Sequence, residues 1–281
     1  MQSVAVTGVS SGIGWGTTKV LIQKGFRVFG SVRKSQDAER LSKEFGENFV
    51  PLIFDVTDEA AVQAAAQKVR EQLNGETLFG LVNNAGIAVP APLIHQPTED
   101  FRHQLEVNLV SALIVTKAFV PLLGVDRSLH GKPGRIINIS SVGGKVGAPF
   151  LGAYAASKHG LEGFSESLRR ELMLYRIDVI IVGPGSIATP IWDKGAGTDL
   201  SGYADTDYLE AAQRMMKFMV NDGHRGYPPE KVGEVVWRAL TTPHPRVRYS
   251  VMPGSAINRI VQMLLPKRVV DNIIAKNLGF K

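Results

Sequence analysis

Residues 3–14, SVAVTGVSSGIG, join a short apolar run to a glycine-rich turn, and a helical pattern begins directly after them. Glycine lets the backbone turn tightly and approach an anion without a Cβ in the way. The amino end of the following helix offers unpaired N–H groups and a positive dipole end to the same anion. The stretch therefore predicts a phosphate-binding turn between a strand and a helix, formed by Gly8, Ser10, Ser11, Gly12, Ile13 and Gly14.

The spacing of this turn is G-x-x-x-G-x-G, which differs from G-x-G-x-x-G, the commonest dinucleotide fingerprint. A tight connection without a ligand is the alternative interpretation. The rest of the chain favours a nucleotide, because apolar β-branched runs alternate with helical segments and make this the first strand-to-helix turn. The expected strands lie in SVAVTG, FRVFGSV, FVPLIFDV, LFGLVNNAG, RIINISS and DVIIVGPG, and the expected helices at 12–24, 60–73, 101–123 and 153–175.

This alternation predicts an α/β fold: a doubly wound parallel sheet of the Rossmann type with helices on both faces. We expect one domain over residues 1–281, with a substrate-binding lobe at about 186–228 and a C-terminal helical extension at about 255–281. In the lobe, Tyr208, Ala211, Ala212, Met215 and Met219 form a helical stripe, which is either core packing or a lid over an apolar substrate.

The C-terminal extension carries two apolar stripes, separated by Pro266. For it we favour capping of the core or a dimer contact over docking on a membrane. The first stripe is Ile257, Ile260, Val261, Leu264 and Leu265, and the second is Val269, Val270, Ile273 and Ile274.

Composition narrows the function classes. The chain of 281 residues has no cysteine, which excludes disulfides, thiolate catalysis and thiolate zinc sites, and we expect no metal. Its net charge of +6 comes from scattered residues, so we expect no nucleic-acid partner. No uninterrupted apolar run approaches 18 residues and no leader pattern precedes the first strand, so we expect a cytoplasmic protein without a membrane span.

The end of the second expected strand bears on cofactor choice. An acid there would bind the adenosine ribose of NAD, whereas a cation would pair with the 2′-phosphate of NADP. The sequence places Arg33 and Lys34 there and no acid. Because the guanidinium of Arg33 is a planar donor fork suited to phosphate, and Ser10 adds a hydroxyl, the pattern favours NADP over NAD. The alternative is that both cations are solvated surface residues.

Tyr154 and Lys158, in YAASK, lie four residues apart and therefore on one face of the expected helix. A nearby ammonium and a helix amino end would lower the phenol pKa, which makes the pair suitable for proton transfer. A chance surface pair is the alternative. Polar residues at other strand ends and within an apolar helix favour the site: Ser140, Ser141, the asparagines of LVNNAG, and Asn108.

In this order, TGVSSGIG, NNAG, the helical Asn108, ISS, YAASK and Pro184-Gly185 resemble the short-chain dehydrogenase/reductase family over about residues 3–240. The strand end FGSVRK and the long tail are similar to its hydroxysteroid and retinol dehydrogenase branch. Two positions depart from the family pattern: Gly183, where Asn or an acid is frequent, and the large Trp15 after Gly14.

The resemblance implies a role for each matching residue. Tyr154 would donate or accept the proton, Ser141 would hold the substrate oxygen, Lys158 would bind the nicotinamide ribose and tune Tyr154, and Asn108 would support a water of the proton relay. The further cofactor contacts that it implies are Asp55 and Asn84, with Ile187 and Thr189 on the nicotinamide side.

The implied activity is NADP(H)-dependent interconversion of an alcohol and a carbonyl on an apolar steroid-, retinoid- or lipid-like molecule. The resemblance also implies a homodimer or homotetramer, formed through the helices that carry Asn108 and Tyr154. A non-catalytic, NADP-sensing regulatory protein on the same fold is the alternative, and the presence of both Tyr154 and Lys158 argues against it. An epimerase or dehydratase of the extended relatives would need a larger C-terminal domain.

Overall fold

The computed structural model describes residues 1–190, 199–252 and 266–280, and one parallel sheet lies at its centre. The strand order is β3-β2-β1-β4-β5-β6-β7, so the chain winds outward from β1 in one direction and from β4 in the other. This order confirms the predicted doubly wound sheet. The strands are β1 (Ser3–Val6), β2 (Arg27–Val32), β3 (Phe49–Ile53), β4 (Gly80–Asn83), β5 (Arg135–Ile139), β6 (Asp178–Pro184) and β7 (Arg248–Val251).

Helices connect the strands and cover the sheet. The α-helices of the described part are α1 (Gly12–Gln23), α2 (Ser35–Phe45), α3 (Glu59–Gln72), α4 (Thr98–Leu105), α5 (Ser111–Phe119), α6 (Gly152–Glu171), α8 (Leu209–His224), α9 (Pro229–Thr241) and α11 (Lys267–Leu278). Shorter turns include a π-helical one, η3 (Glu106–Val110), and the 3₁₀ turns η1 (Gly46–Asn48), η2 (Leu93–His95), η4 (Val120–Leu123), η5 (Val142–Gly144), η6 (Leu172–Tyr175) and η7 (Ser201–Tyr203).

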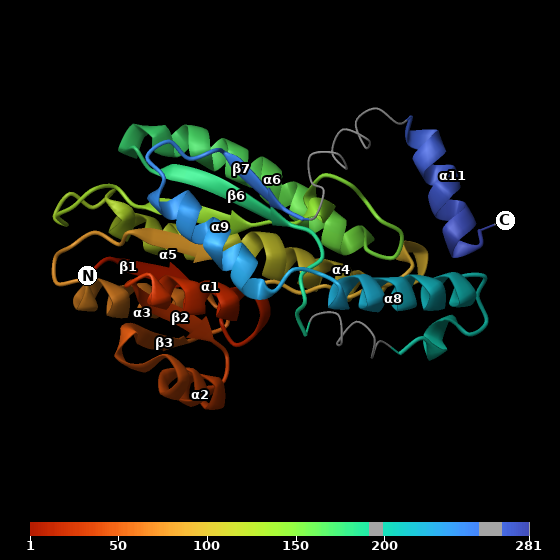
Figure 1. The fold of residues 1–281 in the computed structure, drawn as a ribbon, viewed down its shortest axis with the longest axis horizontal. Helices are drawn as coiled ribbons and strands as arrows, with labels where there is room; N and C mark the ends of the chain where they lie inside the picture. Colours follow the sequence, from red (N-terminus) through yellow and green to blue (C-terminus); the bar gives the residue numbers. More distant parts are fainter. Residues whose placement is uncertain (191–198, 253–265, 281) are drawn as a thin grey trace.

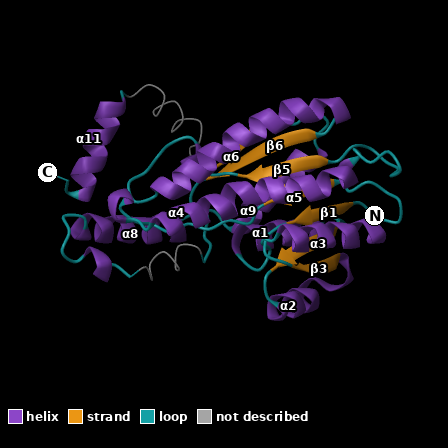
Figure 2. Ribbon diagram, turned by 180° about the vertical axis from the view of Figure 1, so that it is seen from behind, coloured by secondary structure: helices purple, strands orange, loops and turns teal. Residues whose placement is uncertain are grey.

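Two apolar clusters fix these helices on opposite faces of the sheet, which Figures 1 and 2 show from opposite sides. One cluster joins the sheet to α1, α2 and α9 through residues such as Leu21, Leu41 and Val236. The other joins it to α3, α5 and η6 through residues such as Val69 and Phe119. The five inner strands are almost entirely buried, as expected for a sheet built from continuous apolar runs, while the edge strands β3 and β7 are partly exposed.

The segment expected as one helix over 101–123 is a composite of α4, η3, α5 and η4. The whole run, Thr98–Leu123, has the length and apolar composition that a membrane span would need. Its apolar residues have another partner, because Val115, Phe119 and Leu122 are buried in the cluster on the α3 face of the sheet. The run is therefore explained as a core helix.

The elements α8 and α11 lie beyond the sheet, at the end opposite the N-terminus (Figure 1). The stripe of α8 is packed, as one interpretation of the sequence holds, but its partners are Phe150 and Leu278 rather than the sheet. In α11, Ile274 joins this cluster while Val269 and Ile273 are 42% and 50% exposed. The first apolar stripe of the tail, at 257–265, and positions 191–198 of the lobe lie outside the described residues.

Close packing of α1 on α9 depends on two glycines. A Cβ on Gly16 would lie 2.6 Å from the carbonyl carbon of Pro229, and a Cβ on Gly233 would lie 2.8 Å from the carbonyl oxygen of Gly16. Neither contact can be relieved by turning a flexible side chain, because each meets backbone. The first strand-to-helix turn is therefore held against α9 by backbone-to-backbone packing.

Gly16→Ala is predicted to lower the free energy of unfolding by about 1–3 kcal/mol, because the added methyl overlaps the α9 backbone. The matched control is Gly163→Ala in α6, where a Cβ meets nothing within 4 Å. That variant should gain about 1 kcal/mol from helix propensity alone. Urea unfolding of both variants checks the prediction, and a gain in stability for Gly16→Ala would contradict it.

Candidate active site

The glycine turn is held from the neighbouring strand by two polar side chains. Asn84, which follows β4, donates from Nδ2 to the carbonyl oxygens of Thr7 at 2.8 Å and Gly8 at 3.0 Å. The Oγ1 of Thr7 accepts from the backbone N–H of Asn84 at 2.9 Å and of Ala85 at 3.0 Å. These bonds fix the turn at the point between β1 and β4 where the winding reverses, which is where doubly wound sheets bind their ligands.

The turn has the shape that a phosphate needs. Gly8 and Gly12 have φ of 68° and 60°, a left-handed conformation that favours glycine. A Cβ on Gly14 would lie 2.2 Å from the carbonyl oxygen of Gly8 and 2.5 Å from Nδ2 of Asn84, so no side chain fits there. Ser11, the residue before α1, makes no side-chain cap, so the first backbone N–H groups of the helix have no side-chain acceptor there. The residues present therefore fit a dinucleotide pyrophosphate.

The residues expected beside the nicotinamide lie near the turn in different ways. Thr189 is close to it, because a Cβ on Gly12 would lie 3.3 Å from its Cγ2. Ile187 pairs with Tyr227 through a β-bridge, and its side chain is buried in the cluster that joins the sheet to α1 and α9. Ile13 packs against the same cluster.

Beyond the end of β2, Arg33 lies on the surface with 71% of its side chain exposed. Its nearest carboxylate is Asp55, with 3.9 Å between Nη1 and Oδ2. Burial alone would raise the pKa of the Asp55 carboxyl, but hydrogen bonds from Thr57 and the charge of Arg33 together lower that pKa. The guanidinium of Arg40 adds a second cation here by donating to the carbonyl oxygen of Ser10 at 2.7 Å.

The first turn of α6 places Tyr154 beside the loop that follows β5. Ser141 caps η5 by accepting from the backbone N–H of Gly143 at 3.0 Å. A Cβ on Gly143 would lie 3.3 Å from Cε1 of Tyr154 and 3.4 Å from Oγ of Ser141, so phenol ring and hydroxyl meet at this glycine. The neighbouring Ser140 is buried, and its hydroxyl has no hydrogen-bond partner among the described residues.

Lys158 is 4% exposed and donates from Nζ to the carbonyl oxygen of Ile139, the last residue of β5, at 3.0 Å. Its Nζ lies 5.8 Å from the ring centroid of Tyr154. Burial lowers the pKa of Lys158 to about 8. Among the described residues, the ammonium is therefore held by a backbone carbonyl and not by an acid.

The pKa of Tyr154 differs from the expectation. Burial raises this pKa, and the hydrogen bond with Ser141 acts in the opposite direction. The net direction is opposite to the lowering that the sequence suggested from the ammonium of Lys158, which donates to the carbonyl oxygen of Ile139. The hydrogen bond with Ser141 favours the phenolate, but burial outweighs it.

Asn108 sits in the π-helical turn η3, and its side chain joins two loops of the site. Its Oδ1 accepts from the backbone N–H of Ile87 at 2.8 Å, while Nδ2 donates to the carbonyl oxygen of Ile87 at 2.9 Å and to Oγ of Ser157 at 3.0 Å. Both side-chain N–H groups are thus used. Single π-helical turns of this kind are frequent at functional sites.

Sequence reasoning missed several residues that hold these groups. Ser157 links Asn108 to the carbonyl oxygen of Tyr154, to which it donates at 2.7 Å. The fully buried Gln104 binds the backbone of Val89 through both ends of its amide. The only signal for Gln104 was a polar residue one turn before Asn108, and for Ser157 a serine between Tyr154 and Lys158.

The structure explains both departures from the family pattern. Trp15 packs against Phe45 of α2, and its Nε1 donates to Oε1 of Glu44 at 2.8 Å. Gly183 leaves room for a guanidinium, because a Cβ there would lie 2.3 Å from Nη2 of Arg248. The departure at Gly183 is thus matched by an arginine on β7.

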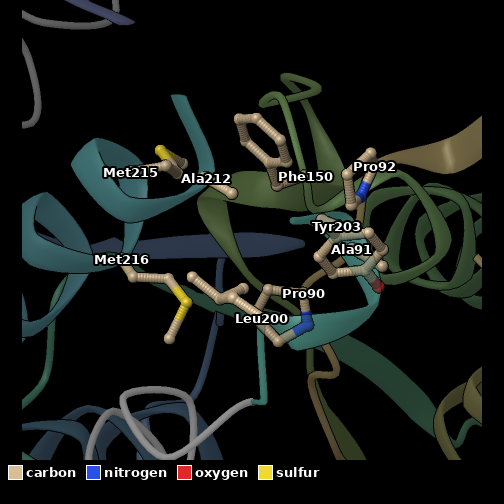
Figure 3. Close-up of a pocket in the computed structure, with 9 residues that line it drawn as sticks. All are labelled: Pro90, Ala91, Pro92, Phe150, Leu200, Tyr203, Ala212, Met215 and Met216. Carbon is tan, nitrogen blue, oxygen red and sulfur yellow. The ribbon is translucent and has the colours of Figure 1, made fainter. Parts of the chain in front are cut away.

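Figure 3 shows an apolar pocket between the segment after β4, the loop before α6 and α8. Phe150, four residues before Tyr154, has a left-handed φ of 64° and meets Tyr208 edge-on at 6.2 Å between ring centroids. Strained backbone of this kind is found most often at functional sites. The residues that line the pocket are Pro90, Ala91, Pro92, Phe150, Leu200, Tyr203, Ala212, Met215 and Met216.

Comparison with known proteins places this geometry in a family. The model of the short chain dehydrogenases matches residues 2–198. An NADPH-dependent 3-dehydrocapnine reductase of Ornithobacterium rhinotracheale is 38% identical, over 99% of this chain and 98% of that protein. Human retinol dehydrogenase 5 is 34% identical, over 94% of this chain and 89% of that protein, in agreement with the narrower resemblance to the retinol dehydrogenase branch.

Solved structures agree with the sequence relatives. A closed form of serine dehydrogenase complexed with NADP⁺ superposes with a TM-score of 0.74 at 27% identity, over 90% of this chain and 96% of that one. Each of these proteins is named for a redox activity, so the alternative of a non-catalytic regulatory protein finds no support. The chain belongs to the short-chain dehydrogenase/reductase family and is an oxidoreductase that acts on alcohol and carbonyl groups.

Proposed function

We propose that the protein is an NADP(H)-dependent oxidoreductase that interconverts an alcohol and a carbonyl on an apolar substrate, with Tyr154 as the proton donor and acceptor. One observation carries the proposal: the phenol of Tyr154 meets the hydroxyl of Ser141 at Gly143, above a buried Lys158. A proton donor and a second hydroxyl at one place can hold a single substrate oxygen between them.

Each residue of the site has a distinct task in reduction. Ser141 donates to the carbonyl oxygen and positions it, and Tyr154 then gives that oxygen its proton. Because burial raises the pKa of Tyr154, the resting group is the neutral phenol, which is the form that can donate. The nicotinamide, when bound, supplies the hydride in this direction and accepts it in the reverse one. In oxidation, Tyr154 takes the proton of the alcohol.

Lys158 supports this chemistry through its positive charge. Its ammonium, with a pKa of about 8, is charged at neutral pH and favours the phenolate that forms on Tyr154 during reduction. A hydroxyl of the nicotinamide ribose is its proposed partner in the cofactor complex. Asn108 and Ser157 link the first turn of α6 to the segment after β4. This link is proposed to direct the phenol of Tyr154 and the ammonium of Lys158 toward the cofactor site.

A preference for NADP over NAD is supported by the surface at the end of β2. Arg33 is exposed there, and its nearest carboxylate, Asp55, lies at 3.9 Å, a separation that makes a weak surface ion pair. Its donor fork is thus available for a 2′-phosphate. The relative named as an NADPH-dependent reductase supports the same preference.

An apolar substrate is supported by the pocket of Figure 3. Met215 and Met216 contribute flexible, polarisable side chains, which adapt to irregular apolar molecules. We therefore place substrate choice in the lobe at about 186–228 together with the segment 90–92. Exposed Leu113 on α5, and Met173 and Leu174 after α6, support association of two copies through these helices.

A redox screen tests the proposal directly. We expect NADPH oxidation with at least one of decanal, 2-tridecanone, all-trans-retinal, a 3-ketosteroid and menadione, and slower turnover with NADH. NADPH binding without turnover of any of these compounds would contradict the proposed activity.

Tyr154→Phe is predicted to reduce turnover at least about 1000-fold while NADPH binding changes less than about twofold, because only the proton is removed. The matched control is Tyr175→Phe, which deletes the hydroxyl of a partly buried tyrosine that ends η6 and packs against the cluster on the α3 face. Steady-state rates and fluorescence titration with NADPH measure both variants. Near-normal turnover of Tyr154→Phe would exclude Tyr154 as the acid.

Lys158→Met is predicted to abolish turnover and yet raise the free energy of unfolding at pH 7 by about 2 kcal/mol. The shift of the Lys158 pKa to about 8 corresponds to about 3 kcal/mol of destabilisation of the folded protein, which the substitution removes. Loss of the hydrogen bond to Ile139 offsets about 1 kcal/mol of this gain.

The sign follows from linkage. The folded-state pKa of Lys158 is depressed, so its buried charge destabilises the folded protein to the full extent below about pH 8. This destabilisation decreases as the pH rises toward the pKa of the lysine in the unfolded chain. The gain from Lys158→Met should therefore be close to zero at pH 10. Urea unfolding at pH 7 and pH 10 gives both numbers, and a variant less stable than the parent at pH 7 would refute the argument.

Arg33→Ala is predicted to weaken NADPH binding about 10- to 100-fold, the loss expected for one charge-assisted contact, and to leave NADH binding unchanged. Lys43→Ala, which removes one positive charge from the last turn of α2, is the control and should leave both affinities within about twofold. Equal losses for NADPH and NADH in Arg33→Ala would show that the 2′-phosphate lies elsewhere.

A further inference from the structure

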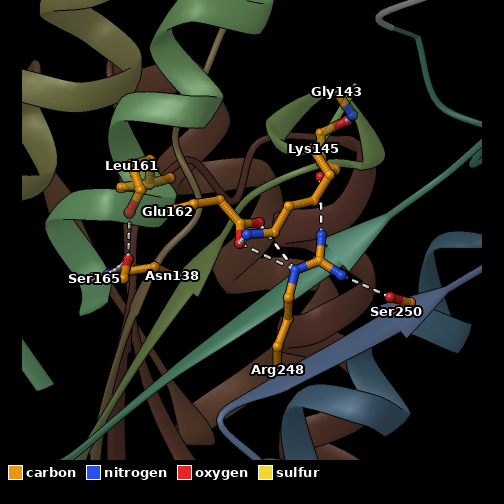
Figure 4. A network of polar contacts seen from close by, with 9 residues as sticks. Asn138, Gly143, Lys145, Leu161, Glu162, Ser165, Arg248 and Ser250 are labelled. Atoms are coloured by element: carbon orange, nitrogen blue, oxygen red, sulfur yellow. Dashed lines mark hydrogen bonds and ion pairs between the residues drawn. The ribbon is translucent and has the colours of Figure 1, made fainter. Parts of the chain in front are cut away.

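A buried acid lies one helical turn beyond Lys158. Glu162 of α6 is 6% exposed, and both of its carboxylate oxygens accept from Nε of Arg248 at 3.1 Å. Lys145, directly after η5, brings a second cation with Nζ at 3.0 Å from Oε2. Figure 4 shows the three side chains converging between α6, the loop after β5 and the edge strand β7.

The guanidinium of Arg248 continues from this acid to the substrate side of the site. Its Nη2 donates to the carbonyl oxygen of Ser141 at 3.2 Å, and its Nη1 donates to Oγ of Ser250 at 2.7 Å. The three nitrogens of one planar fork thus bind an acid on α6, a hydroxyl on β7 and the backbone of Ser141. A lysine could satisfy only one of these partners, because its single ammonium cannot span them.

Two glycines make room for the arrangement. A Cβ on Gly183 of β6 would lie 2.3 Å from Nη2 of Arg248, and a Cβ on Gly144 would lie 3.0 Å from Cγ of Glu162. Gly183 is the position at which the chain departs from its family pattern, and the lack of a side chain there is what makes room for the guanidinium of Arg248. The network is therefore built into the sequence of four separate elements.

A buried carboxylate is costly unless it is paired, and a buried ion pair is by itself weak evidence for stability. Here its location suggests a different purpose. The backbone of Ser141 lies beyond the end of β5, where the ladder to β6 has finished. Its carbonyl oxygen accepts from the backbone N–H of Gly144 at 3.1 Å within the same loop, and also from Arg248, which ties it to a distant element. Arg248 thus anchors the loop at the residue whose hydroxyl meets the phenol of Tyr154.

We propose that Arg248, held by Glu162, is a positioning residue that sets the place of the Ser141 hydroxyl relative to Tyr154. The proposal rests on the proposed function, because it assigns Ser141 to the substrate oxygen. Arg248 touches neither the phenol nor the hydroxyl, and its effect passes through the carbonyl of Ser141. Displacing the guanidinium shifts η5 and loosens the hold on the substrate oxygen, but leaves the glycine turn and Arg33 in place.

The first test compares Arg248→Lys with Arg248→Met, using the compound of the carbonyl panel that turns over fastest. Arg248→Lys keeps a positive charge for Glu162, so it should be the more stable of the two variants in urea. Both should nevertheless lose about 10- to 100-fold in kcat, as expected for misplaced reacting groups. The dissociation constant for NADPH should stay within about twofold of the parent value. A kcat for Arg248→Lys within twofold of the parent would overturn the proposal.

A stability control separates positioning from a general loss of structure. Arg135, at the start of the interior strand β5, also has a mostly buried side chain, which is 17% exposed. It ties the amino end of β5 to three carbonyl oxygens at the end of α9. Arg135→Met should lower the unfolding free energy by at least as much as Arg248→Met while keeping kcat within about twofold. A loss of kcat in Arg135→Met equal to that in Arg248→Met would assign the effect to stability and overturn the proposal.

A double-mutant cycle tests the mechanism with a substitution that leaves the arginine in the chain. Gly183→Ala should displace the guanidinium and reproduce the kcat loss of Arg248→Met, and the double variant should be no slower than Arg248→Met alone. Additive losses would show that Gly183 and Arg248 act separately and would contradict the proposal. If Tyr154→Phe retains turnover, both the proposed function and this inference fail. If Tyr154→Phe loses turnover while the Arg248 and Gly183 variants retain it, only this inference fails.

Discussion

The carboxyl edge of a parallel sheet imposes the constraint on which this site depends. Where a strand stops, its backbone groups lose their ladder partners, and buried groups without partners are costly. In this protein functional side chains supply the missing bonds. Thr7 and Asn84 bind backbone between β1 and β4, and Lys158 binds the last carbonyl of β5. The residues that complete the sheet are thus the same residues that form the site.

This dual use explains why the chemistry could be predicted from the sequence. The polar residues at strand ends and the spacing of Tyr154 and Lys158 follow from chain-local rules, so the doubly wound fold and a polar crevice at the strand ends could be predicted from the residues alone. The meeting of Ser141 with Tyr154 was implied by the family resemblance. The partners that come from distant elements were not. Gln104 and Ser157 looked like ordinary polar helix residues, and Arg248 is 107 residues from the carbonyl it binds. The predicted direction of the Tyr154 pKa shift was wrong, because burial of the phenol, which the sequence does not reveal, raises that pKa.

Two buried charges on α6, one turn apart, are stabilised in different ways. Glu162 has two cations, and both of its oxygens are bonded. Among the described residues, Lys158 contacts a backbone carbonyl oxygen and no acid, and burial lowers its pKa to about 8. A structural charge is expected to be paired, whereas a charge left underpaired in a cleft is available to a ligand. The contrast agrees with the proposed role of Lys158 in the cofactor complex and with a structural role for Glu162.

Substrate choice follows a different logic from the chemistry. Ser141 follows β5, which is paired in register with β4 and β6, and Tyr154 and Lys158 lie on α6. The pocket is lined instead by residues such as Phe150 and Met215. These two residues meet Leu278 of α11 in a small apolar cluster separate from the two that hold the sheet. Because that cluster does not share residues with the sheet clusters, its side chains can be exchanged without disturbing the proton-transfer geometry. The same fold can thus accept different apolar molecules while the reaction stays the same, and identifying the substrate requires the shape of this cluster rather than the motifs of the edge.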